Sequence, residues 1–210
     1  MKHAVPTLGF FLRRIAIDYM RYGYYRWALR FIPPERNPQT LDAKLIEAYS
    51  VTACRTTRMR QRRRGLAVVQ YVRWEHTFVL LATEGAHEQF DRLRSYDARE
   101  APLHIGAYAI GVQGTRVVVE VRQRVWLAVS KRIRLIELGD RTTLESRLNA
   151  LPFYRFPGVI GQLRNLVRAI NKRRRVAGLP LIVIDYGTKW DPKTFLKQTY
   201  PSSSLGLVNG

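Results

Sequence analysis

Cysteine is nearly missing from this chain of 210 residues, since Cys54 is the only one. A single thiol excludes an internal disulfide and a zinc site built from cysteines. Long apolar runs are missing too, because no stretch approaches the roughly 20 apolar residues that a membrane helix needs. Arg13 and Arg14 interrupt the apolar patch near the N-terminus, which is untypical of a secretion signal. We therefore expect a cytoplasmic protein with no membrane partner.

Acidic residues are scarce as well. Sixteen Asp and Glu face 36 Lys and Arg, which gives a formal net charge of +20. Arginine contributes 29 of these basic residues and lysine only 7. Solubility alone is served by a net charge of about 2–8, whereas the planar guanidinium grips phosphate with two hydrogen bonds and stacks on bases. The composition therefore predicts a polyanionic partner, and nucleic acid (RNA or DNA) is the natural one.

Motifs for metal or cofactor chemistry are also lacking. None of the four histidines belongs to a paired metal-binding motif, and Gly158-x-x-Gly161 lacks the Lys-Ser/Thr of a phosphate loop. We expect no metal and no cofactor. His76 and His87 are the candidate catalytic residues, because either imidazole could act as a general acid or base beside a phosphodiester. Whether the protein is an enzyme stays open from the sequence.

Hydrophobic periodicity predicts a mixed α and β fold. Helical spacing covers residues 8–20, 41–49, 126–137 and 159–176, and more weakly 86–94. Alternation of apolar and polar residues predicts strands at 24–32, 66–74, 77–83, 105–113, 115–122 and 181–186. Thr40 and Thr143 are the expected N-caps of two helices, the second of which ends before Pro152.

The element order between residues 24 and 113 is strand, helix, strand, strand, helix, strand. This order predicts an α+β fold with a ferredoxin-like, RRM-like split βαβ core, in which helices cover one face of an antiparallel sheet and leave the other partly open. The order is similar to that of small RRM-like nucleic-acid-processing proteins, such as replication initiators, transposases and CRISPR RNA endonucleases, in architecture alone. We expect a core with an N-terminal helix over 1–125, a helical extension packed on it over 126–198, and a disordered tail over 199–210.

Two basic clusters are the expected phosphate contacts. Six of the ten residues from Arg55 to Arg64 are arginine and none is acidic, whereas a solvated surface helix usually mixes the two signs. The first cluster consists of Arg55, Arg58, Arg60, Arg62, Arg63 and Arg64. The second cluster lies on the helix expected at 159–176 and consists of Arg164, Arg168, Lys172, Arg173, Arg174 and Arg175. The alternative for the second cluster is a favourable interaction with the C-terminal end of its own helix.

Aromatic residues alternate with arginine in the strand expected at 24–32. The more apolar face of that strand, from Tyr25 to Phe31, is expected in the core. Tyr24, Arg26 and Arg30 are then expected to point outward, where tyrosine stacks bases and arginine holds phosphates.

The sequence thus favours a nucleic-acid-binding protein that grips the phosphate backbone through arginine clusters. Two alternatives remain at this point. One is a nucleic-acid-processing enzyme on the same scaffold, such as an endonuclease or a replication or transposition protein. The other is a structural component of a ribonucleoprotein, with further ribonucleoprotein partners.

Overall fold

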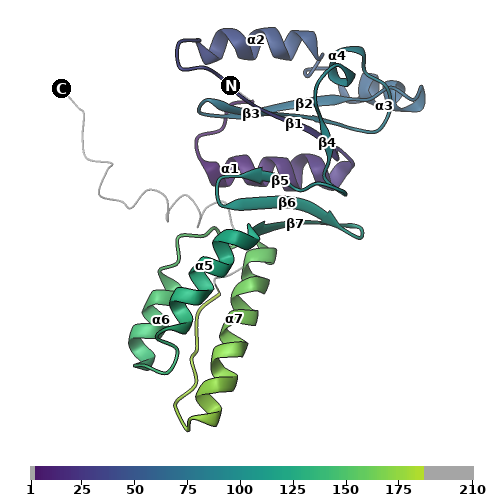
Figure 1. Ribbon diagram of the computed structural model, residues 1–210. Helices are drawn as coiled ribbons and strands as arrows, with labels where there is room; N and C mark the ends of the chain where they lie inside the picture. Colours follow the sequence, from purple (N-terminus) through teal and green to yellow (C-terminus); the bar gives the residue numbers. More distant parts are fainter. Residues whose placement is uncertain (1–2, 187–210) are drawn as a thin grey trace, which may run out of the picture. The chain divides into compact units, whose positions relative to one another are not determined.

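The computed structural model describes residues 3–186 and divides the chain into two compact units (Figure 1). The N-terminal unit spans residues 1–122, and the C-terminal unit begins at Gln123. The fold is α+β with antiparallel sheets, as expected from the sequence. The tail predicted over 199–210, and residues 187–198 of the predicted extension, lie outside the described residues.

A four-stranded sheet organises the N-terminal unit. Its strands are β1 (Arg26–Phe31), β2 (Val69–Trp74), β3 (Thr77–Ala82) and β4 (Tyr96–Asp97), in the spatial order β2-β3-β1-β4. Every neighbouring pair is antiparallel, so β1 and β2 run in the same direction with β3 between them. Helices α2 (Pro38–Ala48) and α3 (Arg55–Arg63) connect β1 to β2, and the short α4 (Glu88–Asp91) connects β3 to β4.

The strand expected at 105–113 is not part of this sheet. Gly106 adopts a positive φ of 53° and reverses the chain directly after β5 (Leu103–Ile105). The chain then continues into β6 (Tyr108–Gln113) and β7 (Arg116–Val121), which form a separate three-stranded antiparallel sheet with β5. The two-residue β4 takes the fourth position instead. Ala98 links the two sheets, because its N–H donates to the Tyr25 carbonyl (2.9 Å) and its carbonyl accepts from Val112 N–H (3.1 Å).

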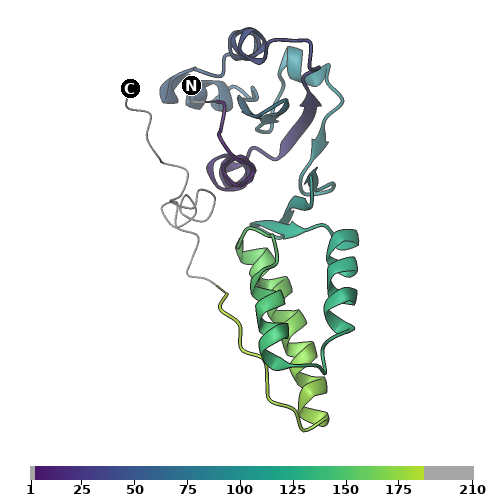
Figure 2. The ribbon, with the colours of Figure 1, turned by 90° about the vertical axis from the view of Figure 1, so that its left-hand side faces the viewer.

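The helix expected near the N-terminus covers the sheet face that was predicted to be open. It begins as α1 (Leu8–Arg13), continues as a π-helix over Arg14–Tyr19, and ends at Gly23 with a φ of 87°. Its apolar side is fully buried and contacts β2, while α2 lies on the opposite face of the sheet (Figures 1 and 2). The prediction of a partly open sheet is therefore wrong, because a helix outside the expected βαββαβ order fills that face.

The predicted orientation of β1 is correct for Trp27, which is buried as expected, but wrong for the residues on the opposite face. Ala28 and Ile32, on the face expected to point outward, are fully buried among the residues beneath α2. Phe31, expected in the core, is 63% exposed. Tyr24, expected at the surface, is only 5% exposed and packs edge-on against Tyr19 of the π-helix. Tyr24 is therefore a core residue and offers no ring to a base.

The predicted caps are shifted in both helices concerned. Asn37, not Thr40, caps α2 by accepting from Gln39 N–H (2.8 Å). In α6 (Arg141–Asn149) the cap is Asp140, whose carboxylate accepts from the N–H of Thr143 itself (2.7 Å). The two threonines lie inside the first turn, because a polar residue three positions earlier supplies the cap.

The described part of the C-terminal unit, residues 123–186, contains three helices. They are α5 (Gln123–Arg134), α6, and the 20-residue α7 (Pro157–Val176), which confirms the long helix expected at 159–176. Leucine and isoleucine side chains from all three meet in one core. Residues 181–186, expected as a strand, pair with no strand among the residues that the structure describes. Instead the Asn171 side chain donates to the Ile182 carbonyl (2.9 Å) and accepts from the Ile182 N–H (2.8 Å). These two bonds satisfy the backbone groups of Ile182 that a neighbouring strand would otherwise pair with. None of the helices that the structure describes could cross a membrane by length and hydropathy.

Candidate nucleic-acid interface

The first basic cluster forms a helix whose arginines have no acidic partner among the described residues. Helix α3 has no buried residue, and Arg64 is its C-cap. No ion pair joins any arginine of this cluster to an acid within residues 3–186. The sequence between Glu47 and Glu75 contains no acidic residue at all. Such a surface repels itself electrostatically, and a polyanion relieves that repulsion.

The N-terminus of α3 carries the single thiol of the chain. Cys54 is exposed at the N-cap position, and its sulfur lies 3.2 Å from the Thr57 hydroxyl oxygen. Hydrogen bonding to the Thr57 side chain holds the pKa of the Cys54 thiol below its usual value, and the charge of Arg60 acts in the same direction. The lowered pKa of Cys54 is therefore mainly an effect of its hydrogen bonds at the start of α3.

A hollow of about 310 Å³ adjoins α3. Its walls come from three separate parts of the N-terminal unit: the turn before β1, helix α3, and the residues after β3. The lining residues are Tyr22, Gly23, Tyr25, Arg62, Thr83 and Glu84. The sequence alone indicated neither Thr83 nor Glu84 as part of a site, because only the tertiary fold brings them to α3.

Backbone pairing fixes one side of this hollow. Ala86 N–H donates to the Gly65 carbonyl (3.1 Å), and Ala67 N–H donates to the Ala86 carbonyl (2.9 Å). Gly85 lies between them with a φ of 113°, and a β-carbon there would come within 2.5 Å of the Gly65 carbonyl oxygen. Only glycine allows the two backbones to come this close. The two backbone hydrogen bonds then hold the segment after β3 against the end of α3.

Arg62 is positioned by packing. Its guanidinium carbon lies 5.0 Å from the centre of the Tyr24 ring, a cation–π contact made by a residue that also lines the hollow. Tyr24 therefore supports the Arg62 side chain from within the core. This indirect role replaces the base stacking predicted for Tyr24 from the sequence.

Arg26 and Arg30, also expected to hold phosphates, are engaged by the protein itself. Arg26 donates to the Asp91 carboxylate (2.5 Å) and to the Gly85 carbonyl (2.9 Å). The His87 N–H and Arg26 together hold the pKa of the Asp91 carboxyl below its usual value. Arg30 donates to the Leu29 and Arg94 carbonyls (2.9 and 3.1 Å). Both side chains fasten β1 to the segment around α4, which no alternation pattern could reveal.

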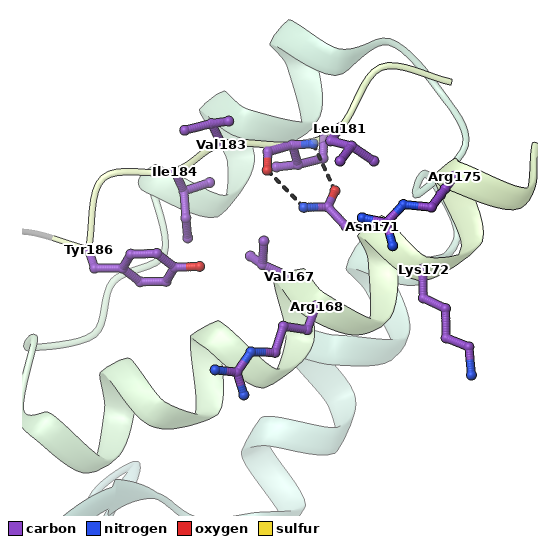
Figure 3. A pocket seen from close by; sticks show the side chains of 10 residues that line it. Val167, Arg168, Asn171, Lys172, Arg175, Leu181, Val183, Ile184 and Tyr186 are labelled. Atoms are coloured by element: carbon purple, nitrogen blue, oxygen red, sulfur yellow. Dashed lines mark hydrogen bonds between the residues drawn. The ribbon is translucent and has the colours of Figure 1, made fainter. Parts of the chain in front are cut away.

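The basic residues of the second cluster point to different sides of helix α7, so they do not form one surface. This helix contains no acidic residue. Its exposed side carries Arg164, Arg168, Lys172 and Arg175. Three of these cations border a hollow of about 410 Å³ between α7 and the extended residues 181–186 (Figure 3). Arg164 lies outside that border, with its guanidinium carbon 5.1 Å from the centre of the Tyr186 ring.

Arg174 and Arg173 are both engaged by other residues of the protein, although only Arg174 is buried. Arg174 is 1% exposed, and its guanidinium donates to three carbonyls: Pro180 (2.7 Å), Glu137 (2.8 Å) and Gly139 (2.8 Å). Arg173 forms an ion pair with the Glu137 carboxylate. Arg174 therefore connects the loops at this end of the C-terminal unit, and the prediction that it contacts nucleic acid is wrong.

We expect Arg174→Gln to lower the free energy of unfolding by about 2 kcal/mol, because buried carbonyls lose their donors. The neighbouring Arg175→Gln, which removes the same charge from an exposed position, is the control and is expected to change stability by less than about 0.5 kcal/mol. Urea unfolding of the full chain, followed by far-UV circular dichroism, measures both. Equal stability of the two variants would contradict the proposal that Arg174 stabilises the fold by connecting these loops.

The two candidate catalytic histidines lie at opposite ends of the sheet. His76 is in the β2–β3 turn beside the end of β1, where its Nδ1 lies 3.1 Å from the Ile32 carbonyl oxygen. His87 caps α4 by accepting from Phe90 N–H (3.3 Å) and stacks on Tyr49. The structure therefore does not bring them together, and each has a local structural role. Within residues 3–186, no group of three or more His, Cys, Asp or Glu side chains is placed to hold a metal ion.

Comparison with known proteins adds no identification. No protein-family model matches the chain, and no curated protein is similar to it in sequence. The site is therefore interpreted from its own geometry and charge.

Proposed function

We propose that this protein binds nucleic acid and that helix α3 is its principal phosphate-binding element. The observation that carries the proposal is the absence of any acidic partner for the α3 arginines in the described structure. Elsewhere in the same unit, arginines such as Arg26, Arg73 and Arg99 have carboxylate partners. Carboxylates thus hold Arg26, Arg73 and Arg99, whereas the described residues supply no acidic partner to the six arginines gathered in the short segment from Arg55 to Arg64.

The proposed scaffold is a split βαβ unit of the ferredoxin-like kind. The antiparallel order β2-β3-β1-β4 supports this assignment, as do the connections through α2 and α3 and through α4. In this arrangement phosphates contact a helix and the loops at one end of the sheet. The sheet face itself is covered by α1 and the π-helix, so the mode of binding differs from stacking on an open sheet.

The exposed row on α7 is proposed as a second phosphate contact. Arg164, Arg168 and Lys172 recur at intervals of four residues, which places them along one side of the helix. Spacing of this kind suits a backbone of regularly repeated charges. Because the row and α3 belong to different units, each is tested by its own variant.

We expect Arg58→Gln, Arg62→Gln and Arg63→Gln, combined in one variant, to weaken binding to all nucleic-acid sequences. The plot of log affinity against log salt should become shallower by about 3, since each lost phosphate contact removes about one unit. Fluorescence anisotropy with labelled RNA and DNA at several salt concentrations measures both quantities. Folding should be retained, because the helix is exposed.

A matched control removes three charges from the same unit at scattered positions. Arg36→Gln, Arg94→Gln and Arg116→Gln change three exposed arginines outside α3, so the net charge falls equally. We expect this variant to keep the salt slope of the unmodified protein. If the two triple variants bind alike, binding reflects overall charge and α3 is not the site.

The same assay with and without magnesium separates the alternatives. Shortened, labelled products would indicate a nucleic-acid-processing enzyme. Retention of intact nucleic acid at fixed stoichiometry would indicate a binder. Ordering of the protein only in the presence of RNA would indicate a structural ribonucleoprotein component.

A further inference from the structure

The hollow beside α3 contains aromatic rings, one guanidinium and one carboxylate. This mixture differs from the surface of α3, where arginine predominates. A phosphate inside the hollow would meet the Glu84 carboxylate and be repelled by it. A neutral planar group meets no such penalty and can stack on tyrosine. The occupant that fits this chemistry is a nucleobase rather than a phosphate.

Tyr22 is the exposed wall of the hollow. Tyr22 is the last residue of the 3-10 helix Met20–Tyr22, and it is 63% exposed although Tyr19, one turn earlier, is only 8% exposed. The Gly23 N–H donates to the Met20 carbonyl (3.0 Å), and the positive φ of Gly23 ends the helix immediately after Tyr22. The backbone that carries the ring is therefore fixed, and fixed aromatic rings lose little entropy when a base stacks on them.

Tyr25 and Glu84 form a wall that an internal network holds in place. The guanidinium carbon of Arg99 lies 5.0 Å from the centre of the Tyr25 ring. The same Arg99 donates to the carboxylates of Glu84 and Asp97, at 2.7 Å in each case. One arginine thus orients both an aromatic ring and the acidic side chain, Glu84, that lines the hollow. The remaining Glu84 oxygen can accept a hydrogen bond from the edge of a base.

We propose that this hollow receives one unpaired nucleobase of a single strand whose phosphates lie on α3. The inference rests on the proposed function and deepens it, because it assigns single-stranded nucleic acid as the preferred ligand. Arg62 belongs to both surfaces, since it lines the hollow and extends from α3. A base in a duplex is stacked and paired, so its ring faces are unavailable to Tyr22.

The test compares a single strand of about 12 nucleotides, a length within the usual range for such sites, with the duplex of the same sequence. We expect Tyr22→Ala to weaken single-strand binding about 5- to 150-fold, as for other base-stacking aromatics, and to leave duplex binding unchanged. Tyr22→Phe keeps the ring and is expected to bind like the unmodified protein. Titration by fluorescence anisotropy gives the dissociation constants.

Phe31→Ala is the matched control. Phe31 is also 63% exposed but lies at the far end of β1 from the hollow, so its removal should not affect either ligand. A Tyr22→Ala protein that binds the single strand as well as Phe31→Ala would overturn the base-binding proposal. In that case, phosphate binding by α3 would still be supported if the variant with Arg58, Arg62 and Arg63 replaced loses affinity. If that variant also binds normally, the proposed function fails as well.

Discussion

Raising the salt concentration from about 50 to 200 mM is expected to weaken duplex binding about a thousandfold. The estimate assumes that about six phosphates are neutralised, because each contributes close to −0.9 to the slope of log affinity against log salt for duplex DNA. The first basic cluster, from Arg55 to Arg64, contains six arginines. A single strand has a lower charge density and a coefficient of about −0.7, so the same contacts predict a loss of a few hundredfold.

The measurement is a titration of one labelled oligonucleotide at four or more salt concentrations, in its single-stranded and duplex forms. Two slopes in the ratio of about 0.7 to 0.9 would indicate that the same cations contact both ligands. A nearly flat dependence would contradict phosphate-dominated binding. The net charge of +20 would then serve another purpose, such as repulsion between copies of the chain.

Periodicity in the sequence predicted most of the elements but not which side of β1 is covered. The strand was correctly located, yet the alternation of Tyr24, Arg26 and Ala28 with the more apolar residues between them suggested one open face. Both faces are covered, because α2 packs on one and α1 with the π-helix packs on the other. In a sheet between two layers, alternation no longer separates core from solvent. The short side chain of Ala28 is buried there as completely as any larger one.

The correct role of Arg174 could have been obtained from the sequence. Leu163, Val167 and Ile170 form the apolar side of α7, and Arg174 continues that side four residues later. Its position on the helix predicts burial, whereas its neighbours in the basic run suggested exposure. A cluster of like charges at a helix end should therefore be divided by helical phase before it is assigned to a ligand.

The hollow beside α3 could not have been predicted from the sequence. Tyr22, Arg62 and Glu84 are far apart along the chain, and none belongs to a recognisable motif. They meet because β3 pairs with β1 and because the segment after β3 pairs with the end of α3. The two-residue strand β4 carries no periodic signal either, so the edge of the sheet was assigned to the wrong segment.

Asp42→Ala is expected to lower the free energy of unfolding by about 3–5 kcal/mol, the range found when one partner of a buried ion pair is removed. The Asp42 carboxylate is buried between α2 and β2. It accepts from Arg73 Nε (2.7 Å), Arg73 Nη2 (2.8 Å) and the Tyr71 hydroxyl (2.5 Å). Burial and the adjacent carboxylate raise the pKa of Tyr71, so its hydroxyl stays a donor. Without Asp42, the buried Arg73 guanidinium keeps its charge but has no counterion.

Two further variants distinguish this mechanism from a general loss of packing. Glu88→Ala breaks the exposed ion pair between Glu88 and Arg92 (2.7 Å) and should change stability by less than about 1 kcal/mol. The double variant Asp42→Leu with Arg73→Met replaces the buried charges with apolar side chains, and should recover much of the loss. Urea unfolding of the four proteins gives the comparison. A double variant less stable than Asp42→Ala would show that the cost arises from altered packing of α2 on the sheet rather than from the unpaired guanidinium. Asp42 lies on α2 and not on α3, so we expect the folded fraction of Asp42→Ala to bind nucleic acid like the unmodified protein when binding is measured at low temperature.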